Sequence, residues 1–205
     1  MPAECAYAEA GVGRPLRVSH ASAVRSNSRG RYTPGVNAEP LLGEIARTLQ
    51  QLHFDVVLIG NAAAALQGAP VTTVDFDFMF RKTPTNIRKL KSLAHSLRAT
   101  ILRPYYPVSD LYRVTRDDDG LQLDFMATIH GVRSFAGMRS RALIVEIGGA
   151  PLAVASLADI IRSKKAAGRP RDRAVIDLLE RTYEEASHQG EQTGRTPPRK
   201  RPRAR

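Results

Sequence analysis

The sequence predicts a mixed α/β domain, in which a small mixed β-sheet is flanked by helices and followed by a C-terminal helical pair. Three observations lead to this prediction. A buried strand at 56–59 runs through Gly60 into an alanine-rich helix, and a second strand with alternating phenylalanines ends at Phe80. A β-hairpin pattern follows around the turn at 117–120. Strands that alternate with helical segments are typical of an α/β architecture.

Four longer segments have the apolar spacing of amphipathic helices. In the first, Leu42, Ile45 and Leu49 fall on one face. The second begins at Thr83-Pro84, a capping residue followed by the residue favoured in a first helical turn. We expect these helices at 38–54, 84–97, 157–167 and 170–186, and further strands at 99–102, 111–115, 121–126, 143–147 and 152–154.

The strand at 72–80 carries two acidic residues on one face. At the period of a β-strand, Phe76 and Phe78 point to the core, while Asp75 and Asp77 point together to the opposite face, about 6–7 Å apart. Aspartate is depleted in strands, and neighbouring carboxylates repel each other. A hard divalent cation such as Mg²⁺ takes oxygen ligands and would reverse that repulsion. The pattern therefore predicts a metal site, although a solvated edge strand could carry the same pair.

A third acidic residue lies inside the second strand of the hairpin. Asp124 stands between Leu123 and Phe125, which face the core, so its carboxylate points to the opposite face. If this strand pairs with the phenylalanine strand, Asp124 reaches Asp75 and Asp77. The three aspartates of the turn lack the ligand spacing of a calcium-binding loop, and we interpret them as a solvated hairpin tip.

The turn after the first strand has the chemistry of an anion site. Gly60 and Asn61 open the alanine-rich helix, and asparagine is a favoured N-cap. The free N–H groups of a helix N-terminus attract anions. An ordinary strand-to-helix turn would look the same in isolation, but the acidic strand begins only a few residues later.

Together these blocks resemble the nucleotidyltransferase superfamily, and within it the bacterial AbiEii-like group of abortive-infection, type IV toxin–antitoxin proteins. The resemblance rests on Ile59–Pro70, on Thr73-Val74-Asp75-Phe76-Asp77 and on the later block Ser156–Asp172. It covers about residues 38–187. The paired blocks are more specific than either block alone.

The resemblance implies an activity and a set of site residues. Such an enzyme would move NMP from an NTP to a hydroxyl group of RNA, with tRNA as one candidate, or of a protein. Mg²⁺ would be the cofactor, and a toxin of this group would have a cognate antitoxin as a separate protein partner. The implied catalytic and metal-binding residues are Asp75, Asp77 and Asp124, and the implied nucleotide-binding residues are Gly60, Asn61, Thr73 and Lys164.

Two departures from the family pattern keep an alternative open. Asn61 stands where the family usually has glycine or serine, and Val71 where many relatives carry arginine. The chain could instead be a catalytically degenerate member of the fold that binds nucleic acid or acts like an antitoxin. A glycosyltransferase with an Asp-x-Asp motif is disfavoured, because such folds usually place a large nucleotide-binding half before that motif.

Composition predicts one globular domain with basic ends. The chain has 205 residues and 42% hydrophobic content, and Cys5 is its single cysteine. No apolar run is long enough to span a membrane, so we expect a soluble, cytoplasmic protein. Much of the net charge of +11 lies in 1–37 and 188–205, which we expect to be disordered on either side of a domain at 38–187. These ends could contact RNA phosphates or serve only as solubilising tails.

Overall fold

The described part of the molecule, residues 38–73 and 75–193 of the computed structural model, is a mixed β-sheet with helices packed around it. The predicted mixed α/β fold is confirmed. The strands are β1 (Val56–Ile59), β2 (Phe76–Phe80), β3 (Thr100–Leu102), β4 (Tyr112–Arg116), β5 (Leu121–Met126), β6 (Leu143–Ile147) and β7 (Ala150–Val154). The helices are α1 (Ala38–Gln51), α2 (Gly60–Ala65), α3 (Pro84–Ser96), α4 (Phe135–Arg141), α5 (Leu157–Ala167) and α6 (Pro170–Thr193).

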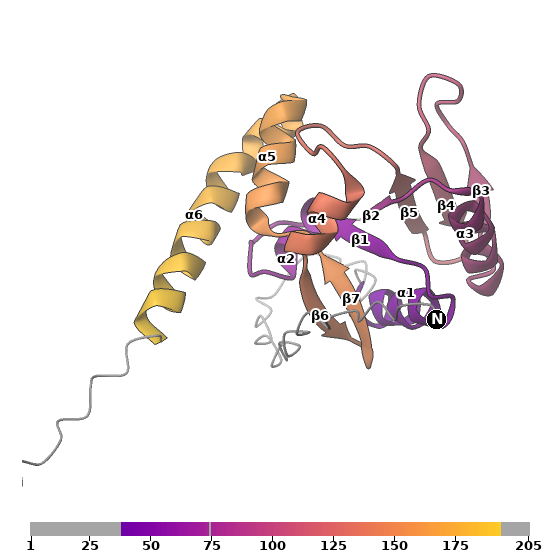
Figure 1. Ribbon diagram of the computed structural model, residues 1–205, viewed down its shortest axis with the longest axis horizontal. Coiled ribbons are helices and arrows are strands. Elements are labelled where there is room, and N and C mark those ends of the chain that lie inside the picture. Colours follow the sequence, from indigo (N-terminus) through magenta and orange to yellow (C-terminus); the bar gives the residue numbers. More distant parts are fainter. Residues whose placement is uncertain (1–37, 74, 194–205) are drawn as a thin grey trace, which may run out of the picture.

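The strands are ordered β3-β4-β5-β2-β1-β7-β6 across the sheet (Figure 1). The central strand β2 is antiparallel to β1 and parallel to β5. Strands β3, β4 and β5 form an antiparallel meander, and β6 and β7 form a hairpin at the other edge. The connection from β2 to β5 passes through α3, β3 and β4. This crossover brings two acidic segments that are distant in sequence into adjacent strands.

Aromatic side chains form much of the core on one face of β2. Phe76, Phe78 and Phe80 are buried there, as their alternation predicts. The ring of Phe125 on β5 stacks on Phe78, with centroids 5.0 Å apart, and on Phe54, with centroids 5.8 Å apart. A one-residue slip would turn these rings toward the opposite face, so the cluster holds the register of β2 against β5.

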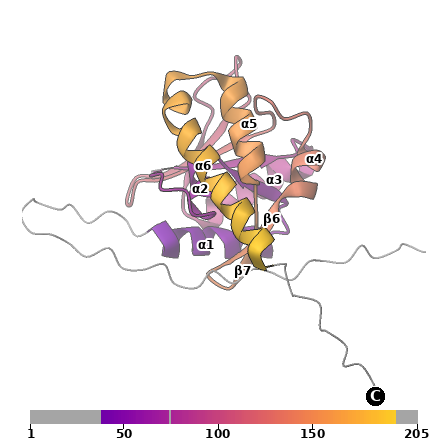
Figure 2. The same ribbon diagram turned by 90° about the vertical axis from the view of Figure 1, so that its left-hand side faces the viewer.

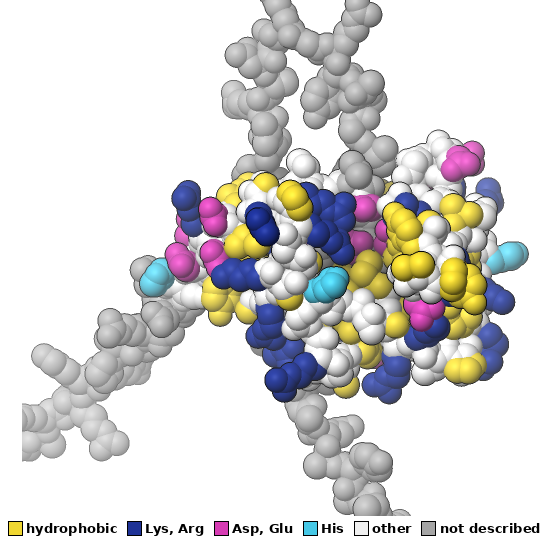
Figure 3. Space-filling model, turned by 90° about the horizontal axis from the view of Figure 1, so that it is seen from above, with side chains coloured by type: hydrophobic (Ala, Val, Ile, Leu, Met, Phe, Trp, Pro, Cys, Tyr) yellow, Lys and Arg dark blue, Asp and Glu magenta, His cyan; other side chains and the backbone are white. Residues whose placement is uncertain are grey.

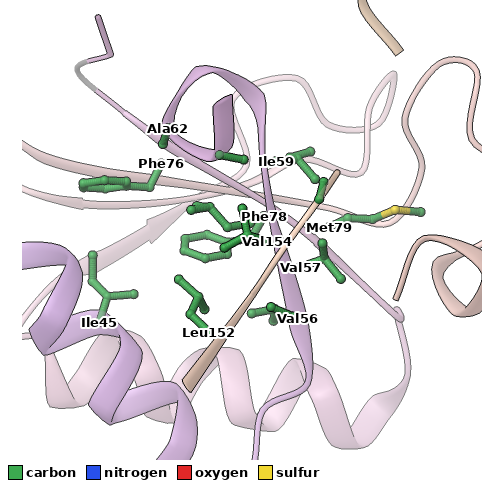
Figure 4. Close-up of a cluster of buried hydrophobic side chains, with 14 of the residues drawn as sticks. Ile45, Val56, Val57, Ile59, Ala62, Phe76, Phe78, Met79, Leu152 and Val154 are labelled. Atoms are coloured by element: carbon green, nitrogen blue, oxygen red, sulfur yellow. The ribbon is translucent and has the colours of Figure 1, made fainter. Parts of the chain in front are cut away.

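Helix α1 closes this core. Ile45 of α1 lies in the buried cluster with Val56 of β1 and Leu152 of β7 (Figure 4). The helix packs against β6, β7 and α3, while α2 packs against β1, β2 and α5. Asp77 lies on the face of β2 opposite to the phenylalanines and stays half-buried.

Several helix boundaries follow from capping residues. Thr83 caps α3 by accepting a hydrogen bond from the backbone N–H of Asn86 at 3.2 Å, and Pro84 stands in the first turn, as predicted. Gly168 ends α5 in the left-handed conformation, with φ of 62°. Helix α6 continues to Thr193, which is past its predicted end and into the segment expected to be a tail.

The short helix α4 was not predicted. Ser134 caps it by accepting a hydrogen bond from the backbone N–H of Gly137 at 3.1 Å, and Phe135 and Met138 are buried. The helix has only seven residues and contains a glycine. A segment of two turns is too short to establish a helical period, so its fold depends on packing against β1.

Some predictions concern segments outside the described residues. These are the N-terminal segment 1–37 with Cys5, Val74, and the basic tail from residue 194 onward. Within 38–73 and 75–193, no helix is both long and apolar enough to cross a membrane.

Candidate active site

The parallel pairing of β2 with β5 aligns charged residues in one row across the sheet. Asp77 lies directly opposite Asp124, and Arg113 of β4 lies opposite Asp124 on its other side. Neighbouring strands are about 4.8 Å apart, so side chains on one face of such a row come into contact. Asp75 immediately precedes β2. One oxygen from each of the three aspartates lies within 4.8 Å of the others, so the three predicted acidic residues converge.

Asp77 has the most strongly perturbed environment of the three. Burial, followed by the negative charges of Asp75 and Asp124, raises the pKa of Asp77 from 3.8 to about 7. The charges of Lys164 and Arg171 act in the opposite direction. No side chain in the described ranges donates a hydrogen bond to Asp77. Its carboxylate is therefore ready to accept a cation, because a bound positive charge would stabilise its ionised form.

Asp75 is oriented by two neighbours. Thr73 Oγ1 donates to Asp75 Oδ1 at 3.2 Å and to the main-chain carbonyl of Asp75 at 2.7 Å. Gln122 Nε2, on β5, donates to Asp75 Oδ2 at 3.4 Å. The resemblance implied a nucleotide contact for Thr73. In the structure the Thr73 hydroxyl fixes the direction of the Asp75 carboxylate, and its contact with a nucleotide stays a prediction.

Asp124 is bound by an arginine that was not predicted. Arg113 donates from Nε to Asp124 Oδ1 at 2.8 Å and from Nη2 to Asp124 Oδ2 at 2.6 Å. A carboxylate as buried as that of Asp124, which is 7% exposed, requires a partner of this kind. The sequence held the signal, since a hairpin that closes from Arg116 to Leu121 also pairs Arg113 with Asp124. The tip, Asp117–Asp119, is exposed, as predicted.

Gly60 allows the first turn to approach Asp77 closely. Its φ is +70°, and a Cβ at this position would lie 2.5 Å from Asp77 Oδ2. A larger residue would both strain the backbone and displace the carboxylate. Glycine is thus required at position 60, because the absence of a side chain leaves room for the Asp77 carboxylate.

Asn61 does not cap α2, contrary to the prediction. The cap position belongs to Ile59, whose backbone is extended as the last residue of β1, so Asn61 is the second residue of the helix. Asn61 Nδ2 donates to the carbonyl of Thr72 at 3.3 Å and thereby ties α2 to the loop before β2. Asn61 Oδ1 is buried without a partner among the described residues, and Asn61 lines the cleft described below.

Lys164 is held within the helical pair close to the acidic residues. Helices α5 and α6 pack side by side (Figure 2), and Lys164 Nζ donates to Asp172 Oδ1 at 3.1 Å across them. The two side chains are only 13% and 10% exposed. Asp172 therefore joins the two helices and holds Lys164 near the acidic residues. From there, the positive charge of Lys164 acts to lower the pKa of Asp77.

A cleft of about 700 Å³ opens at the three carboxylates. Lys164, Arg169 and Arg171 of the α5–α6 region line it together with Tyr105 of the β3–β4 loop. Seen from above, acidic side chains lie between a group of Lys and Arg side chains and a hydrophobic surface (Figure 3). Tyr105 and Tyr106 are 56% and 62% exposed.

The donor set fits a hard divalent cation. The cluster of Asp75, Asp77 and Asp124 offers only carboxylate oxygens, which Mg²⁺, Mn²⁺ and Ca²⁺ prefer, whereas zinc sites use mainly imidazole and thiolate ligands. The raised pKa of Asp77 has the same physical origin, an excess of negative charge in a partly desolvated site.

Comparison with known proteins adds information about the fold. No protein-family model matches the chain, and no curated protein matches it in sequence. The solution structure of the antibiotic-resistance factor ANT(2'')-Ia matches 76% of this chain and 93% of its own, with 14% identity and a TM-score of 0.50. A candidate nucleotidyltransferase (TM1012) from Thermotoga maritima matches 81% of this chain and 100% of its own, with 18% identity and a TM-score of 0.47. The structural neighbours are nucleotidyltransferases.

Proposed function

We propose that the protein is a Mg²⁺-dependent nucleotidyltransferase that moves NMP from an NTP to an acceptor hydroxyl and releases pyrophosphate. The observation that carries this proposal is the convergence of Asp75, Asp77 and Asp124 at a cleft large enough for a nucleotide. Asp77 and Asp124 lie on adjacent strands, and Asp75 lies just before the first of them. The chain shares its fold with a nucleotidyltransferase. A rigid sheet holds such a constellation more accurately than loops would.

Each residue of the site has a distinct task in this reaction. Asp75 and Asp77 would hold Mg²⁺, which supplies charge neutralisation for the triphosphate and the leaving pyrophosphate. Asp124 completes the acidic site or takes up the proton of the acceptor hydroxyl. Lys164, fixed by Asp172, contributes positive charge for the phosphates. In the reaction, the acceptor oxygen forms a bond to the α-phosphorus while the bond from that phosphorus to the pyrophosphate oxygen breaks.

The lining of the cleft supports RNA, with tRNA as one candidate, over a protein as the acceptor. Arg169 and Arg171 offer positive charge to a phosphate backbone, and the exposed ring of Tyr105 offers a surface on which a base can stack. In this proposal the enzyme acts in the cytoplasm as the toxin of a toxin–antitoxin pair. A separate antitoxin protein would be its partner.

The test is transfer of label from each of the four α-labelled NTPs to total RNA and to lysate protein, with and without Mg²⁺. We expect a labelled RNA band that requires Mg²⁺ and that Asp77→Asn reduces by about a thousandfold or more, since the substitution removes a charge at the centre of the site. Equal labelling by the parent and by Asp77→Asn, with a confirmed acceptor, would remove the carboxylates from the mechanism.

A second candidate is a catalytically degenerate module that binds nucleotide or nucleic acid without transfer. Three observations favour it. Asn61 occupies the position of the family glycine or serine, and both oxygens of Asp124 already accept hydrogen bonds from Arg113. Val71, where relatives carry arginine, packs against the core instead. Mg²⁺-dependent nucleotide binding without transfer to any acceptor would select this candidate.

A further inference from the structure

The third acidic residue of the site is paired with a cation of the protein itself. Arg113 binds both oxygens of Asp124 in the bidentate geometry that is strongest for a guanidinium and a carboxylate. Arg113 also lines the cleft, and its side chain is 26% exposed. The guanidinium therefore lies at the boundary between the acidic cluster and solvent.

The negative charges of the three carboxylates are neutralised to different degrees by neighbouring hydrogen-bond donors. Asp124 accepts two charged hydrogen bonds, Asp75 accepts two weaker ones from neutral groups, and Asp77 accepts none from a side chain of the described ranges. A group of three carboxylates within 4.8 Å would repel strongly without some positive charge. Arg113 provides the charge that contacts the cluster directly.

We propose that Arg113 is a resident counter-cation, which stabilises the site without metal and competes with a divalent ion for Asp124. This inference rests on the metal site of the proposed function. Each carboxylate oxygen has a second lone pair, so an ion and Arg113 can both contact Asp124, but their positive charges then repel each other. Arg113 accordingly weakens ion binding while it prevents the empty site from destabilising the sheet.

The environment of Arg113 agrees with this role. Its two hydrogen bonds to Asp124 hold the guanidinium against the acidic cluster. An arginine side chain is not deprotonated in proteins, so this positive charge is permanent. A neutral hydrogen-bond donor at this position would orient Asp124 equally well but would not compete with an ion.

The test compares Arg113→Met with Arg116→Met by Mn²⁺ titration calorimetry and by thermal unfolding with and without Mn²⁺. We expect Arg113→Met to unfold several degrees lower than the parent without metal, and to bind Mn²⁺ roughly tenfold more tightly, because one positive charge next to the ion is gone. Arg116 is on the same strand and pairs with Asp119 at the hairpin tip. Its substitution should lower the unfolding temperature and leave Mn²⁺ affinity unchanged.

The outcomes separate this inference from the proposed function. Mn²⁺ binding by the parent, with equal or weaker binding by Arg113→Met, would overturn the counter-cation role and leave the metal site intact. Failure of both proteins to bind Mn²⁺ would overturn the metal site and the counter-cation together. If Arg113→Met does not fold, Arg113→Lys decides, since it loses the bidentate contact but keeps a mobile charge. A gain of roughly two- to threefold in affinity is then expected, and no gain would contradict the proposal.

Discussion

Two carboxylates near the cleft, Asp159 and Asp77, have opposite surroundings. Asp159 is 1% exposed and accepts hydrogen bonds from Arg141 at 3.0 Å to each oxygen, from Arg162 at 2.9 Å and from Ser156 at 3.3 Å. Asp77 has no such donor among the described side chains and lies beside two further carboxylates. Both residues line the same cleft, so burial alone does not identify a functional acid. The absence of a side-chain partner distinguishes Asp77 from Asp159, and it supports the proposed role of Asp77 at a cation site.

The largest expected effect is on the activity and the metal-free stability of Asp77→Asn. The substitution removes a charge that has no side-chain partner, so the free energy of unfolding without metal should rise by about 2–4 kcal/mol at pH 8 while transfer activity is lost. Urea unfolding in the presence of a chelator measures the first quantity. A variant that is less stable than the parent under these conditions would place Asp77 with Asp159 as a structural residue.

The same charge predicts a pH dependence with a definite sign. The folded protein holds the Asp77 proton with a pKa of about 7, against 3.8 for an ordinary aspartate, so folding is favoured by protonation. Without metal, the free energy of unfolding should therefore be unaffected by Asp77 below pH 3.8, where the group is protonated in both states. It should fall by about 2–4 kcal/mol as the pH rises to about 7. The difference in free energy of unfolding between the parent and Asp77→Asn, measured at a series of pH values, isolates this dependence. Mg²⁺ affinity should change in the opposite direction, rising with pH as Asp77 ionises.

Substitution of Asp159, whose charge is paired with two arginines, should lower the free energy of unfolding rather than raise it. Asp159→Asn would leave Arg141 and Arg162 without their acceptor charge, and the buried amide would point donors at them. We expect a loss of about 2–3 kcal/mol, below the value for a fully buried pair because both arginines are about half exposed. Chemical denaturation measures this loss. Mn²⁺ affinity should stay at the parental value, and a large change would show that Asp159 belongs to the metal site.

A pair of glycine substitutions tests how closely the first turn approaches Asp77. Gly60 and Gly120 have the same φ of +70°, but a Cβ at position 60 meets Asp77 Oδ2, whereas a Cβ at position 120 has nothing within 4 Å. Gly120→Ala should therefore cost about 1 kcal/mol from backbone strain alone. Gly60→Ala should cost about 1 kcal/mol more and weaken Mn²⁺ binding by roughly tenfold. Equal costs and equal affinities for the two variants would contradict the close approach.

The smallest effect is expected at the hairpin tip. Asp118 is exposed and its carboxylate forms no hydrogen bond or ion pair in the described ranges, so Asp118→Asn should change stability by less than about 0.5 kcal/mol and leave activity unchanged. Parallel measurement with Asp77→Asn controls for the loss of a negative charge in general. A strong loss of activity here would indicate that the tip itself contacts a substrate.

Much of the acidic site was predictable, because the period of a strand fixes which side chains share a face. The position of Asp77 between buried phenylalanines and that of Asp124 between core residues follow from that period. The strand predicted at 72–80 begins only at Phe76, so Asp75 lies just before it. Arg113 was predictable in principle from the hairpin register, but its contact with Asp124 was overlooked. The alignment of Asp77 with Asp124 required the parallel pairing of β2 with β5, which local sequence does not specify.

Other features depend on tertiary structure alone. Asp159 follows a capping serine, yet Arg141, one of its two arginine partners, comes from α4, a helix that the sequence did not reveal. Asn61 has the preferences of an N-cap, but the extended cap residue is Ile59, two positions earlier, at the end of the preceding strand. In both cases local propensity was overridden by how two elements meet. The catalytic and nucleotide-binding roles assigned by resemblance remain predictions.

The parallel contact between β2 and β5 also bears on how the molecule folds. Asp77 and Asp124 become neighbours only after α3, β3 and β4 have crossed over, so the acidic cluster depends on non-local contacts whose loop must close first. During synthesis, Asp77 and Asp124 would stay apart until β5 had paired with β2. If the cluster binds metal as proposed, metal affinity would appear once β5 has paired with β2, before β6 and β7 complete the sheet.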